Sequence, residues 1–279
     1  MTTWARPLTL TAAGVLIVLA ATGITAGVNG CGSLSSSTGR GTPDASPTDR
    51  GPCEQLLVPA YFTAPYWEAA INSKHKPAEM ILNVDGVGAG TAPNKALQYL
   101  VKRAQAADVK VLGYSSTADG QRPAAEVETD VRDYAAWYGV TSVFLDRVAG
   151  TAQEYSYYKQ IADYVHGAQG AQVWMNPGVY PDQDYMSIAD VVMTFEGSYA
   201  QYLTEKVPNW ALSYPPGRFA HTIYATPAAV LGNALNLAQQ RDAGHVFVTD
   251  LVGSNPYQGL PSYWTAEDAA ATAGCTGSG

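Results

Sequence analysis

The chain has 279 residues, and only 14% of them are charged, against the roughly 25% that is usual for a soluble domain. The 16 Lys and Arg and 24 Asp and Glu residues give a net charge of −8, which argues against a nucleic-acid-binding protein because phosphate contacts need a basic surface. A hydrophobic fraction of 47% excludes a largely disordered chain. With 18 Tyr, 6 Trp and 27 Gly, the composition favours an exported protein with a neutral, polar ligand.

Residues 1–31 are predicted to be an export signal and not part of the fold. After Arg6, an uncharged run over residues 8–28 is rich in Ala, Leu, Val and Gly, as in the apolar core of a signal peptide. The segment that ends it, Val28-Asn29-Gly30-Cys31, is similar to a bacterial lipobox, whose cysteine carries the lipid. Three outcomes stay open: lipidation of Cys31, ordinary cleavage, or an uncleaved span, since the run is long enough to cross a bilayer. Membrane contact is expected only through this segment.

Residues 32–52 are predicted to be a flexible linker, because Ser, Thr, Gly, Pro and Asp dominate it and offer little apolar surface to bury. The domain then covers residues 53–275. Cys53 and Cys275 lie at its two ends and are predicted to form a disulfide in an oxidising compartment, with two free surface thiols as the alternative. Neither cysteine lies at zinc-ligand spacing from a His or another Cys, so no metal is expected there.

Within this domain, short apolar runs alternate with amphipathic stretches. The runs are rich in β-branched and aromatic residues and are bounded by Gly, Pro or Asp, which is typical of strands. The amphipathic stretches have helical spacing, and several open with residues that favour helix starts. Strands are predicted over residues 56–62, 80–84, 110–115, 141–146, 172–176, 190–196, 220–225 and 245–250, and helices over residues 94–107, 123–138, 152–169, 199–210, 228–243 and 265–273.

Eight strands alternating with helices predict a single-domain α/β fold, the (β/α)8 TIM barrel. An open doubly wound sheet has the same alternation and is the alternative. The strand count and the lack of a Gly-rich phosphate loop after the first strand favour the barrel. The two cysteines also favour it, because a barrel brings the ends of the domain together.

Polar residues gather where the predicted strands end. In a TIM barrel those ends form the mouth that carries the active site. The strands themselves are almost free of charge, so polar groups at their ends cost stability and indicate a function. The strand-end residues are Tyr61, Asn83, Asp85, Tyr114, Asp146, Asn176, Glu196, Tyr224 and Asp250.

Asp146 and Glu196 end the fourth and sixth strands. Side-chain alternation puts Asp146 on one face with residues 142 and 144, and Glu196 on one face with residues 192 and 194, so both carboxylates can point into the mouth. Strands are about 4.8 Å apart, so the backbones of these two strands should lie roughly 9–10 Å from one another. Inward side chains shorten the distance between the carboxyl groups, and the result suits either a retaining or an inverting glycosidase. Two carboxylates between aromatic walls favour acid-assisted cleavage of a glycosidic bond, with one carboxyl protonated and the other ionised. The structural alternatives are caps and ion pairs for the acids, turns for Asp85 and Asn176, a loop cap for Asp250, and ordinary packing for the tyrosines.

The sequence lacks the motifs of zinc, serine-hydrolase and phosphate-binding sites. The four His residues show no zinc-ligand spacing, and no G-x-S-x-G motif is present. The glycine-rich segment 86–90 is not followed by the Lys and Ser or Thr of a phosphate-binding loop. No cofactor and no metal are therefore expected.

Several segments of the domain resemble proteins of the spherulin-4, or spherulation-specific family 4, group. Together they extend over residues 55–270. They are LVPAYF at 57–62 with Trp67, ILNVDG at 81–86, VLGYSST at 111–117 with Gly120 and Arg122, Tyr134 with Trp137, VFLD at 143–146, NPG at 176–178 and TFE at 194–196.

The resemblance implies a (β/α)8 glycoside hydrolase that acts on galactosamine- or N-acetylgalactosamine-containing polysaccharides. Asp146 would be the nucleophile and Glu196 the general acid/base of an endo-acting, retaining enzyme, expected to be a monomer. Two positions depart from the family and leave the substrate open. Arg147 replaces an acid and is expected to contact an anionic group or to lower the pKa of Asp146; the sequence NVDGVG at 83–88 replaces the usual Asn-Pro-Asn/Ser-Gly-Pro-Gly loop. The expected substrate contacts are Tyr61, Asn83, Asp85, Tyr114, Arg122, Arg147, Asn176, Tyr224 and Asp250.

Two functions other than hydrolysis also fit the sequence. A binding module would keep the sugar cleft without turnover, and Arg147 is the reason to consider it. A structural envelope lipoprotein would use the barrel with no carbohydrate role.

Overall fold

A computed structural model describes residues 54–272. The predicted signal segment with Cys31, the predicted linker, and both cysteines of the predicted disulfide, Cys53 and Cys275, lie outside the described residues, so these assignments stay predictions. Within residues 54–272, every helix is too short or too polar to cross a membrane.

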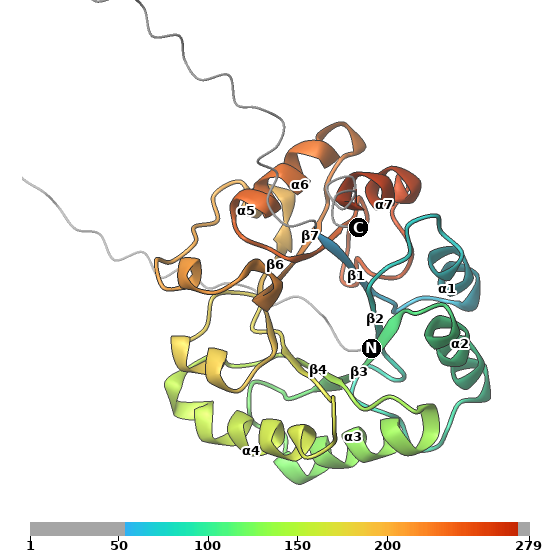
Figure 1. The fold of residues 1–279 in the computed structure, drawn as a ribbon, viewed down its shortest axis with the longest axis vertical. Helices are drawn as coiled ribbons and strands as arrows, with labels where there is room; N and C mark the ends of the chain where they lie inside the picture. The colour runs from blue at the N-terminus through green and yellow to red at the C-terminus, as the bar shows by residue number, and fades with distance from the viewer. Residues whose placement is uncertain (1–53, 273–279) are drawn as a thin grey trace, which may run out of the picture. The chain divides into compact units, whose positions relative to one another are not determined.

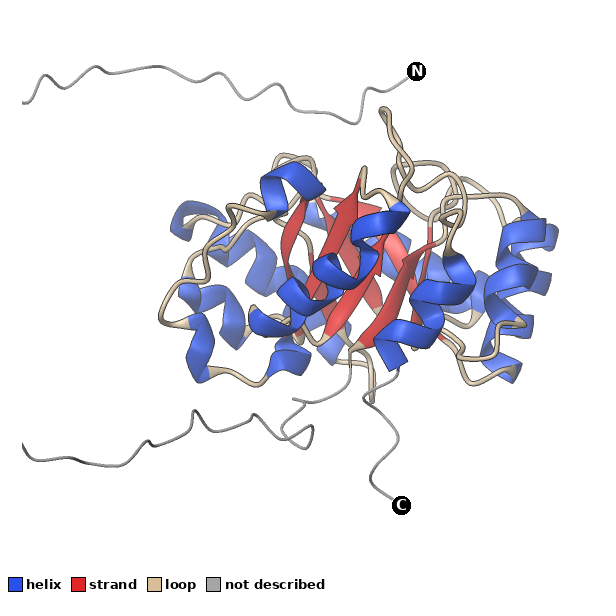
Figure 2. Cartoon of the chain, turned by 90° about the horizontal axis from the view of Figure 1, so that it is seen from above, coloured by secondary structure: helices blue, strands red, loops and turns tan. Residues whose placement is uncertain are grey.

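Eight parallel strands form a closed barrel, in which each strand pairs with the next and β8 pairs with β1. The predicted (β/α)8 fold is therefore confirmed, and the open sheet is excluded. Figure 1 shows the helices arranged around the strands, and Figure 2 shows the strands enclosed by them. The strands are β1 (Gln55–Pro59), β2 (Glu79–Leu82), β3 (Lys110–Ser116), β4 (Val143–Asp146), β5 (Val173–Met175), β6 (Val191–Ser198), β7 (Phe219–Tyr224) and β8 (His245–Val248).

The helices follow the predicted alternation with two differences. The first is α1, which the sequence pattern did not predict because the helix is short and buries only Trp67, Ala70 and Ile71. The second is the helix predicted over residues 199–210, which ends after one turn at Tyr202. Pro208, inside the predicted range, cannot donate a helical hydrogen bond and restricts the residue before it, so a helix could not continue through it to residue 210 without a kink or break. The helices are α1 (Ala64–Ile71), α2 (Lys95–Ala106), α3 (Ala124–Tyr138), α4 (Tyr155–His166), α5 (Tyr199–Tyr202), α6 (Leu231–Gln240) and α7 (Trp264–Thr272).

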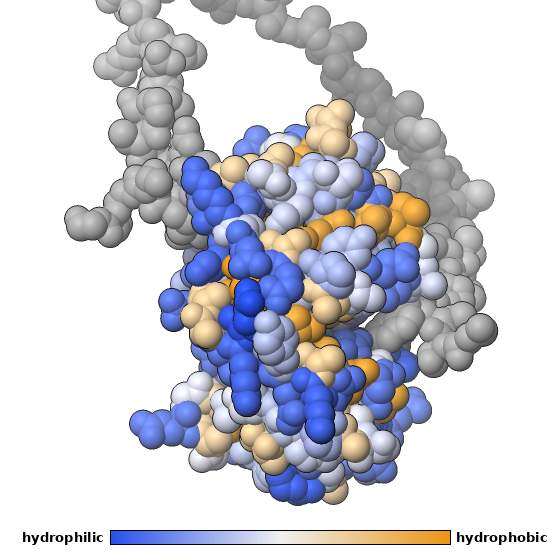
Figure 3. Space-filling model, turned by 90° about the vertical axis from the view of Figure 1, so that its right-hand side faces the viewer, coloured by the Kyte–Doolittle hydropathy of each residue, from blue (hydrophilic) through white to orange (hydrophobic). Residues whose placement is uncertain are grey.

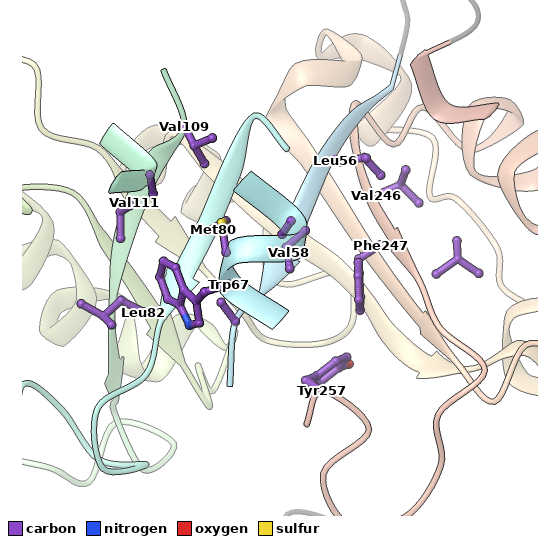
Figure 4. Close-up of a cluster of buried hydrophobic side chains, with 14 of the residues drawn as sticks. Leu56, Val58, Trp67, Met80, Leu82, Val109, Val111, Val246, Phe247 and Tyr257 are labelled. Atoms are coloured by element: carbon purple, nitrogen blue, oxygen red, sulfur yellow. The ribbon is translucent and has the colours of Figure 1, made fainter. Parts of the chain in front are cut away.

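Successive side chains of the strands fill two different cores. Leu57 of β1 faces the barrel interior, whereas its neighbours Leu56 and Val58 face the helices. Figure 4 shows part of this outer layer, where Trp67 of α1 lies against β2. The interior is packed and is not a pore, so the site must lie above it, at the mouth. The interior is filled by Leu57, Ile81, Leu112, Tyr114, Phe144, Trp174, Val191, Met193 and Ala220.

The side of the barrel that carries α1 and α2 is mostly hydrophilic, with apolar residues between the polar ones (Figure 3). Exposed aromatic side chains of these helices include Tyr66 and Tyr99. Apolar atoms normally contribute more than half of a protein surface, so these residues need no special explanation.

Candidate active site

The two predicted catalytic carboxylates share one hydrogen-bond donor. Asn176, directly after β5, donates from its amide nitrogen to Asp146 Oδ1 at 2.8 Å and to Glu196 Oε2 at 2.5 Å. Because the same nitrogen contacts both oxygens, they lie no farther apart than the sum of these distances, about 5.3 Å. The strand between the two acids thus joins them at the mouth.

Asp146 points inward through regular alternation on β4. Phe144 belongs to the barrel interior, and Val143 and Leu145 pack in the outer layer against the helices. Asp146 has the same parity as Phe144, and the residue is 7% exposed. The parity expected for β4 from the sequence is the one observed.

Glu196 points inward for a different reason. Val191 and Met193 of β6 face the interior, and Val192 faces the helices, so strict alternation would turn Glu196 outward. A β-bulge intervenes: Met193 pairs with Ala220 and Phe195 with His221, which leaves Thr194 as an extra residue. The extra residue reverses the parity, so Phe195 packs outward and Glu196 inward. The alternation predicted for residues 191–196 is therefore wrong, although it gave the correct direction for Glu196.

The two carboxyl groups have unequal surroundings. Burial, together with the negative charge of Asp146, raises the pKa of Glu196 to about 7. Burial also raises the pKa of Asp146, but hydrogen bonds from Tyr114 and Asn176 to its two oxygens oppose this effect by stabilising the ionised form. Near neutral pH we therefore assign the negative charge to Asp146 and the shared proton to Glu196.

Tyrosines form the wall beside the pair. Tyr114 donates from its hydroxyl to Asp146 Oδ2 at 2.7 Å. The ring of Tyr61 meets those of Tyr114 and Tyr257 edge to face, with centroids 5.7 and 5.8 Å apart. Tyr224 is partly exposed, and burial together with the charge of Glu196 raises its pKa. Tyr61, Tyr114 and Tyr224 thus come together with the carboxylates, as the strand-end pattern predicted.

Tyr257 is a site residue that the sequence did not reveal. It lies in the loop between β8 and α7, packs against Phe247 (Figure 4), and donates from its hydroxyl to Glu196 Oε1 at 2.8 Å. Its own backbone N–H donates to Asn255 Oδ1, which closes a turn. The Asn255-Pro256 turn signal was visible in the sequence, but nothing there indicated that the following side chain returns to the mouth.

Asn83 and Asp85 shape the glycine-rich loop after β2. Asn83 Oδ1 accepts from the N–H of Gly86 at 2.7 Å, and Asp85 Oδ1 accepts from the N–H groups of Val87 and Gly88, both at 2.8 Å. These contacts match the turn alternative for Asp85. The substrate contacts expected of both residues stay predictions.

Arg122, in the connection between β3 and α3, supports the same loop. Its Nη1 lies 2.7 Å from Asp130 Oδ2 and donates to the carbonyl oxygen of Val87 at 3.2 Å. A Cβ at Gly88 would lie 2.2 Å from the carboxylate of Asp130, so only glycine fits there. Asp130 was not anticipated from the sequence. A substrate contact by Arg122 stays a prediction.

Arg147 and Asp250 are engaged with neighbouring loops. Arg147 has a left-handed backbone, with φ 52°, and its Nη2 lies 2.6 Å from Asp119 Oδ2. Its charge acts to lower the pKa of Asp146 as expected, but burial outweighs it. Asp250 accepts from the N–H and the hydroxyl of Ser262 at 3.0 and 2.5 Å, which matches the loop-cap alternative.

Among residues 54–272, no group of three His, Cys, Asp or Glu side chains is arranged to hold a metal ion. The chemistry of the mouth is that of the carboxylate pair, its bridging amide and the tyrosine hydroxyls. Such a group can transfer a proton, stabilise positive charge and attack an electrophilic carbon.

The fold and the site together define a class: a closed (β/α)8 barrel with two carboxylates joined at its carboxyl-terminal mouth. The family model for spherulation-specific family 4 matches residues 55–271, and the chain belongs to this family. The resemblance found in the sequence is thereby confirmed.

Two relatives are informative. Spherulin-4 of Physarum polycephalum is 27% identical over 231 residues, which cover 77% of this chain and 69% of the relative. The crystal structure of Aspergillus clavatus Sph3 in complex with GalNAc has a TM-score of 0.68 and 26% sequence identity, and the match covers 80% of this chain and 98% of that one.

Proposed function

We propose that the protein is a retaining glycoside hydrolase that cleaves galactosamine- or N-acetylgalactosamine-containing polysaccharides within the chain. The observation that carries this proposal is the bridging of Asp146 and Glu196 by Asn176. The limit of about 5.3 Å between the bridged oxygens supports the retaining class, whose carboxyl groups are ~5–5.5 Å apart. Inverting enzymes need ~6.5–9.5 Å to admit a water molecule.

In the first step, ionised Asp146 attacks the anomeric carbon and forms an ester with the sugar. The bond from that carbon to the glycosidic oxygen breaks with its electron pair on the oxygen. Glu196 transfers its proton to this oxygen, so the shortened polysaccharide leaves as an alcohol. The raised pKa of Glu196, about 7, supports this role because the group is largely protonated below neutral pH.

In the second step, ionised Glu196 removes a proton from a water molecule, and the resulting hydroxide attacks the anomeric carbon. The ester bond to Asp146 breaks, Asp146 regains its negative charge, and Glu196 regains its proton. Two inversions at the same carbon give net retention. The hydrogen bonds that Asp146 accepts from Tyr114 and Asn176 support its departure as a carboxylate.

The substrate class is inferred from similarity to known proteins. Sph3, at 26% identity, was crystallised with GalNAc, and the segments resembling the family include the end of β4 with Asp146 and the part of β6 with Glu196. Tyr61 and Tyr224 add aromatic surface beside the carboxylates, which suits the apolar faces of sugar rings.

The test is to incubate the purified domain with a galactosamine-rich polymer and measure new reducing ends. Proton NMR of the first products then gives their anomeric configuration. We expect hydrolysis with retention, and no hydrolysis by the Asp146→Asn and Glu196→Gln variants. Asp163→Asn is the matched control, since Asp163 is an exposed residue of α4 paired with Lys159. Hydrolysis that persists in both site variants would contradict the assignment, and inverted products would contradict the retaining mechanism.

The binding-module alternative predicts saturable polysaccharide binding without products. The reason to consider this alternative was Arg147, and the side chain of Arg147 is paired with Asp119 of the β3–α3 loop. The reducing-end assay separates the two functions directly.

We further propose that the domain is exported, because the polysaccharides in question lie outside cells. The support is the apolar run at residues 8–28 and the lipobox-like segment that ends at Cys31. Mass spectrometry of the mature N-terminus distinguishes lipidation, ordinary cleavage and an uncleaved anchor.

A further inference from the structure

Glu196 depends on one extra residue for its direction. Val192 pairs with Phe219 in the outer layer, and Glu196 pairs with Thr222 on the inner side. Between these two pairs, β6 advances by four residues and β7 by three. If Thr194 did not bulge, Glu196 would have the parity of Val192 and would face the helices.

The bulge is held by a buried chain of three side chains. Thr194 Oγ1 lies 2.9 Å from His221 Nε2, and His221 Nδ1 lies 2.8 Å from the hydroxyl of Tyr202. All three side chains are completely buried. They lie on the outer side of the barrel wall, where the ring of Phe195 packs against Tyr202 with centroids 4.6 Å apart.

The protonation state of His221 suits this arrangement. Burial, and then the nearby charge of Arg241, lowers the pKa of His221 to about 3. The guanidinium of Arg241 lies 4.4 Å from the ring centroid of Tyr202 and covers that end of the chain. A neutral imidazole has one donor and one acceptor, and each hydroxyl partner can supply the complement. Both ring nitrogens are therefore satisfied where water is excluded.

The neighbouring glycine is consistent with the same design. A Cβ at Gly197 would lie 2.7 Å from Phe195 Cζ, so glycine is needed for the ring of Phe195 to take its outward place. The outward place of Phe195 and the inward place of Glu196 are two results of one bulge.

We infer that His221 is a positioning residue for Glu196: by holding the hydroxyl of Thr194, it fixes the bulge that turns Glu196 into the mouth. His221 acts through the backbone of β6 and contacts no reacting group. This inference rests on the proposed function, since the position of Glu196 affects turnover only if Glu196 is the proton donor.

Two substitutions of His221 separate its two contacts. His221→Gln carries an amide near the position of Nε2 and keeps the contact with Thr194. His221→Asn carries an amide near the position of Nδ1 and keeps only the contact with Tyr202. We expect kcat to fall about 10²-fold in His221→Asn, because small displacements of a reacting group have effects of that size. We expect kcat of His221→Gln to stay much closer to that of the unmodified protein, with KM nearly unchanged in both.

Substitution of Thr194 provides a second route if His221→Asn does not fold. Thr194→Val removes the hydroxyl and keeps the branched shape, whereas Thr194→Ser keeps the hydroxyl. The inference predicts a loss of kcat in Thr194→Val and its rescue in Thr194→Ser. Thermal unfolding of all four variants shows whether each is folded at the assay temperature.

The deciding measurement does not need turnover. The protonation of Glu196 is followed by infrared difference spectra of its carboxyl group, assigned by subtracting the Glu196→Gln protein. The other titratable groups facing Glu196 are Asp146 and tyrosines 61, 114, 224 and 257. The pKa of each of these tyrosines is raised above its usual value of 10. Signals below pH 9 therefore belong to the carboxylate pair.

We expect Glu196 to titrate near pH 7 in the unmodified protein and in His221→Gln, and at a clearly different pH in His221→Asn and Thr194→Val, because both the burial of its carboxyl group and its distance from Asp146 then change. An unshifted Glu196 titration in these last two variants overturns the inference, whatever their kcat. If the unmodified protein hydrolyses nothing, the proposed function fails, but the titration still decides whether His221 positions Glu196.

Discussion

The amino-terminal and carboxyl-terminal ends of the barrel both bury carboxylates, but beside opposite kinds of neighbour. At the amino-terminal end, Glu79 of β2 lies 3.1 Å from His245 of β8 and 3.9 Å from Lys110 of β3. These groups line a cavity of about 590 Å³. At the mouth, Asp146 and Glu196 lie beside one another and share a neutral amide.

The difference separates a structural arrangement from a functional one. A carboxylate paired with a base recovers part of the cost of leaving water, whereas two neighbouring carboxylates cannot both be ionised without repulsion. The mouth therefore keeps an arrangement that costs stability and that forces one acid to hold a proton. Such perturbed pairs in a barrel mouth are typical of active sites.

The largest effect is expected for Asp146→Asn. Loss of the nucleophile should lower kcat on the order of 10⁴–10⁶-fold, as for other covalent mechanisms. The unfolding temperature should stay the same or rise, because the variant no longer buries an ionised carboxylate at this position. Reducing-end release and thermal unfolding measure the two effects. A large loss of stability in this variant would contradict the view that the carboxylates at the mouth cost stability while Glu79 at the other end contributes to it.

Glu196→Gln should lower kcat by about 10²–10⁴-fold on the polysaccharide, which is the usual share of acid/base catalysis. The loss should be much smaller for the first step on an aryl glycoside, because a good leaving group departs without a proton. Comparing both substrates in pre-steady-state assays checks this. Equal losses on both would show that Glu196 does more than donate a proton.

Glu79→Gln should have the opposite pattern. Both partners of the Glu79–His245 contact are 6% exposed, so removing the charge should lower the free energy of unfolding by about 1–3 kcal/mol. The activity of the folded protein should be unchanged, because this end of the barrel is remote from the mouth. Urea unfolding with parallel assays measures both, and the exposed control Asp163→Asn should change neither. Lost activity in folded Glu79→Gln would couple the two ends.

The activity should fall as pH rises past about 7, by tenfold per pH unit, as Glu196 loses its proton. The pH profile of polysaccharide hydrolysis measures this.

The stability of the folded protein should also fall as pH rises. The folded protein holds this proton up to about pH 7 and the unfolded chain only to about 4.5, so the folded state binds more protons between these values. The free energy of unfolding of the unmodified protein should therefore decrease, compared with that of Glu196→Gln, as pH rises through that range. Unfolding midpoints at several pH values test the sign.

The smallest effect is expected for Tyr257→Phe. The hydroxyl of Tyr257 donates to Glu196 and thereby lowers the pKa of that carboxyl. Its removal should move the basic limb of the pH profile upward, by less than about one pH unit, with less than about a tenfold change in kcat. A downward shift would mean that Tyr257 stabilises the protonated form.

Much of the site could be predicted from the sequence, because the ends of strands can be recognised in it. Asp146, Asn176 and Glu196 each follow a short apolar run, and in a closed barrel such ends must converge. Tyr257 was not visible, since it reaches Glu196 from a loop 61 positions along the chain. Asn83 and Asp85 were visible as strand-end residues, but their backbone contacts in the glycine-rich loop were not.

The sequence by itself determined the alternation of strands and helices, because hydrophobic periodicity is a local property. The count of eight strands favoured a barrel over an open sheet, and the pairing of β8 with β1 confirmed it. The sequence also placed two acids at strand ends. Only the tertiary structure decided how those acids face one another. Glu196 points inward through a bulge whose partners, Thr194, His221 and Tyr202, lie on β6, β7 and α5. A period-two pattern cannot reveal one extra residue, because the shift exists only relative to the neighbouring strand.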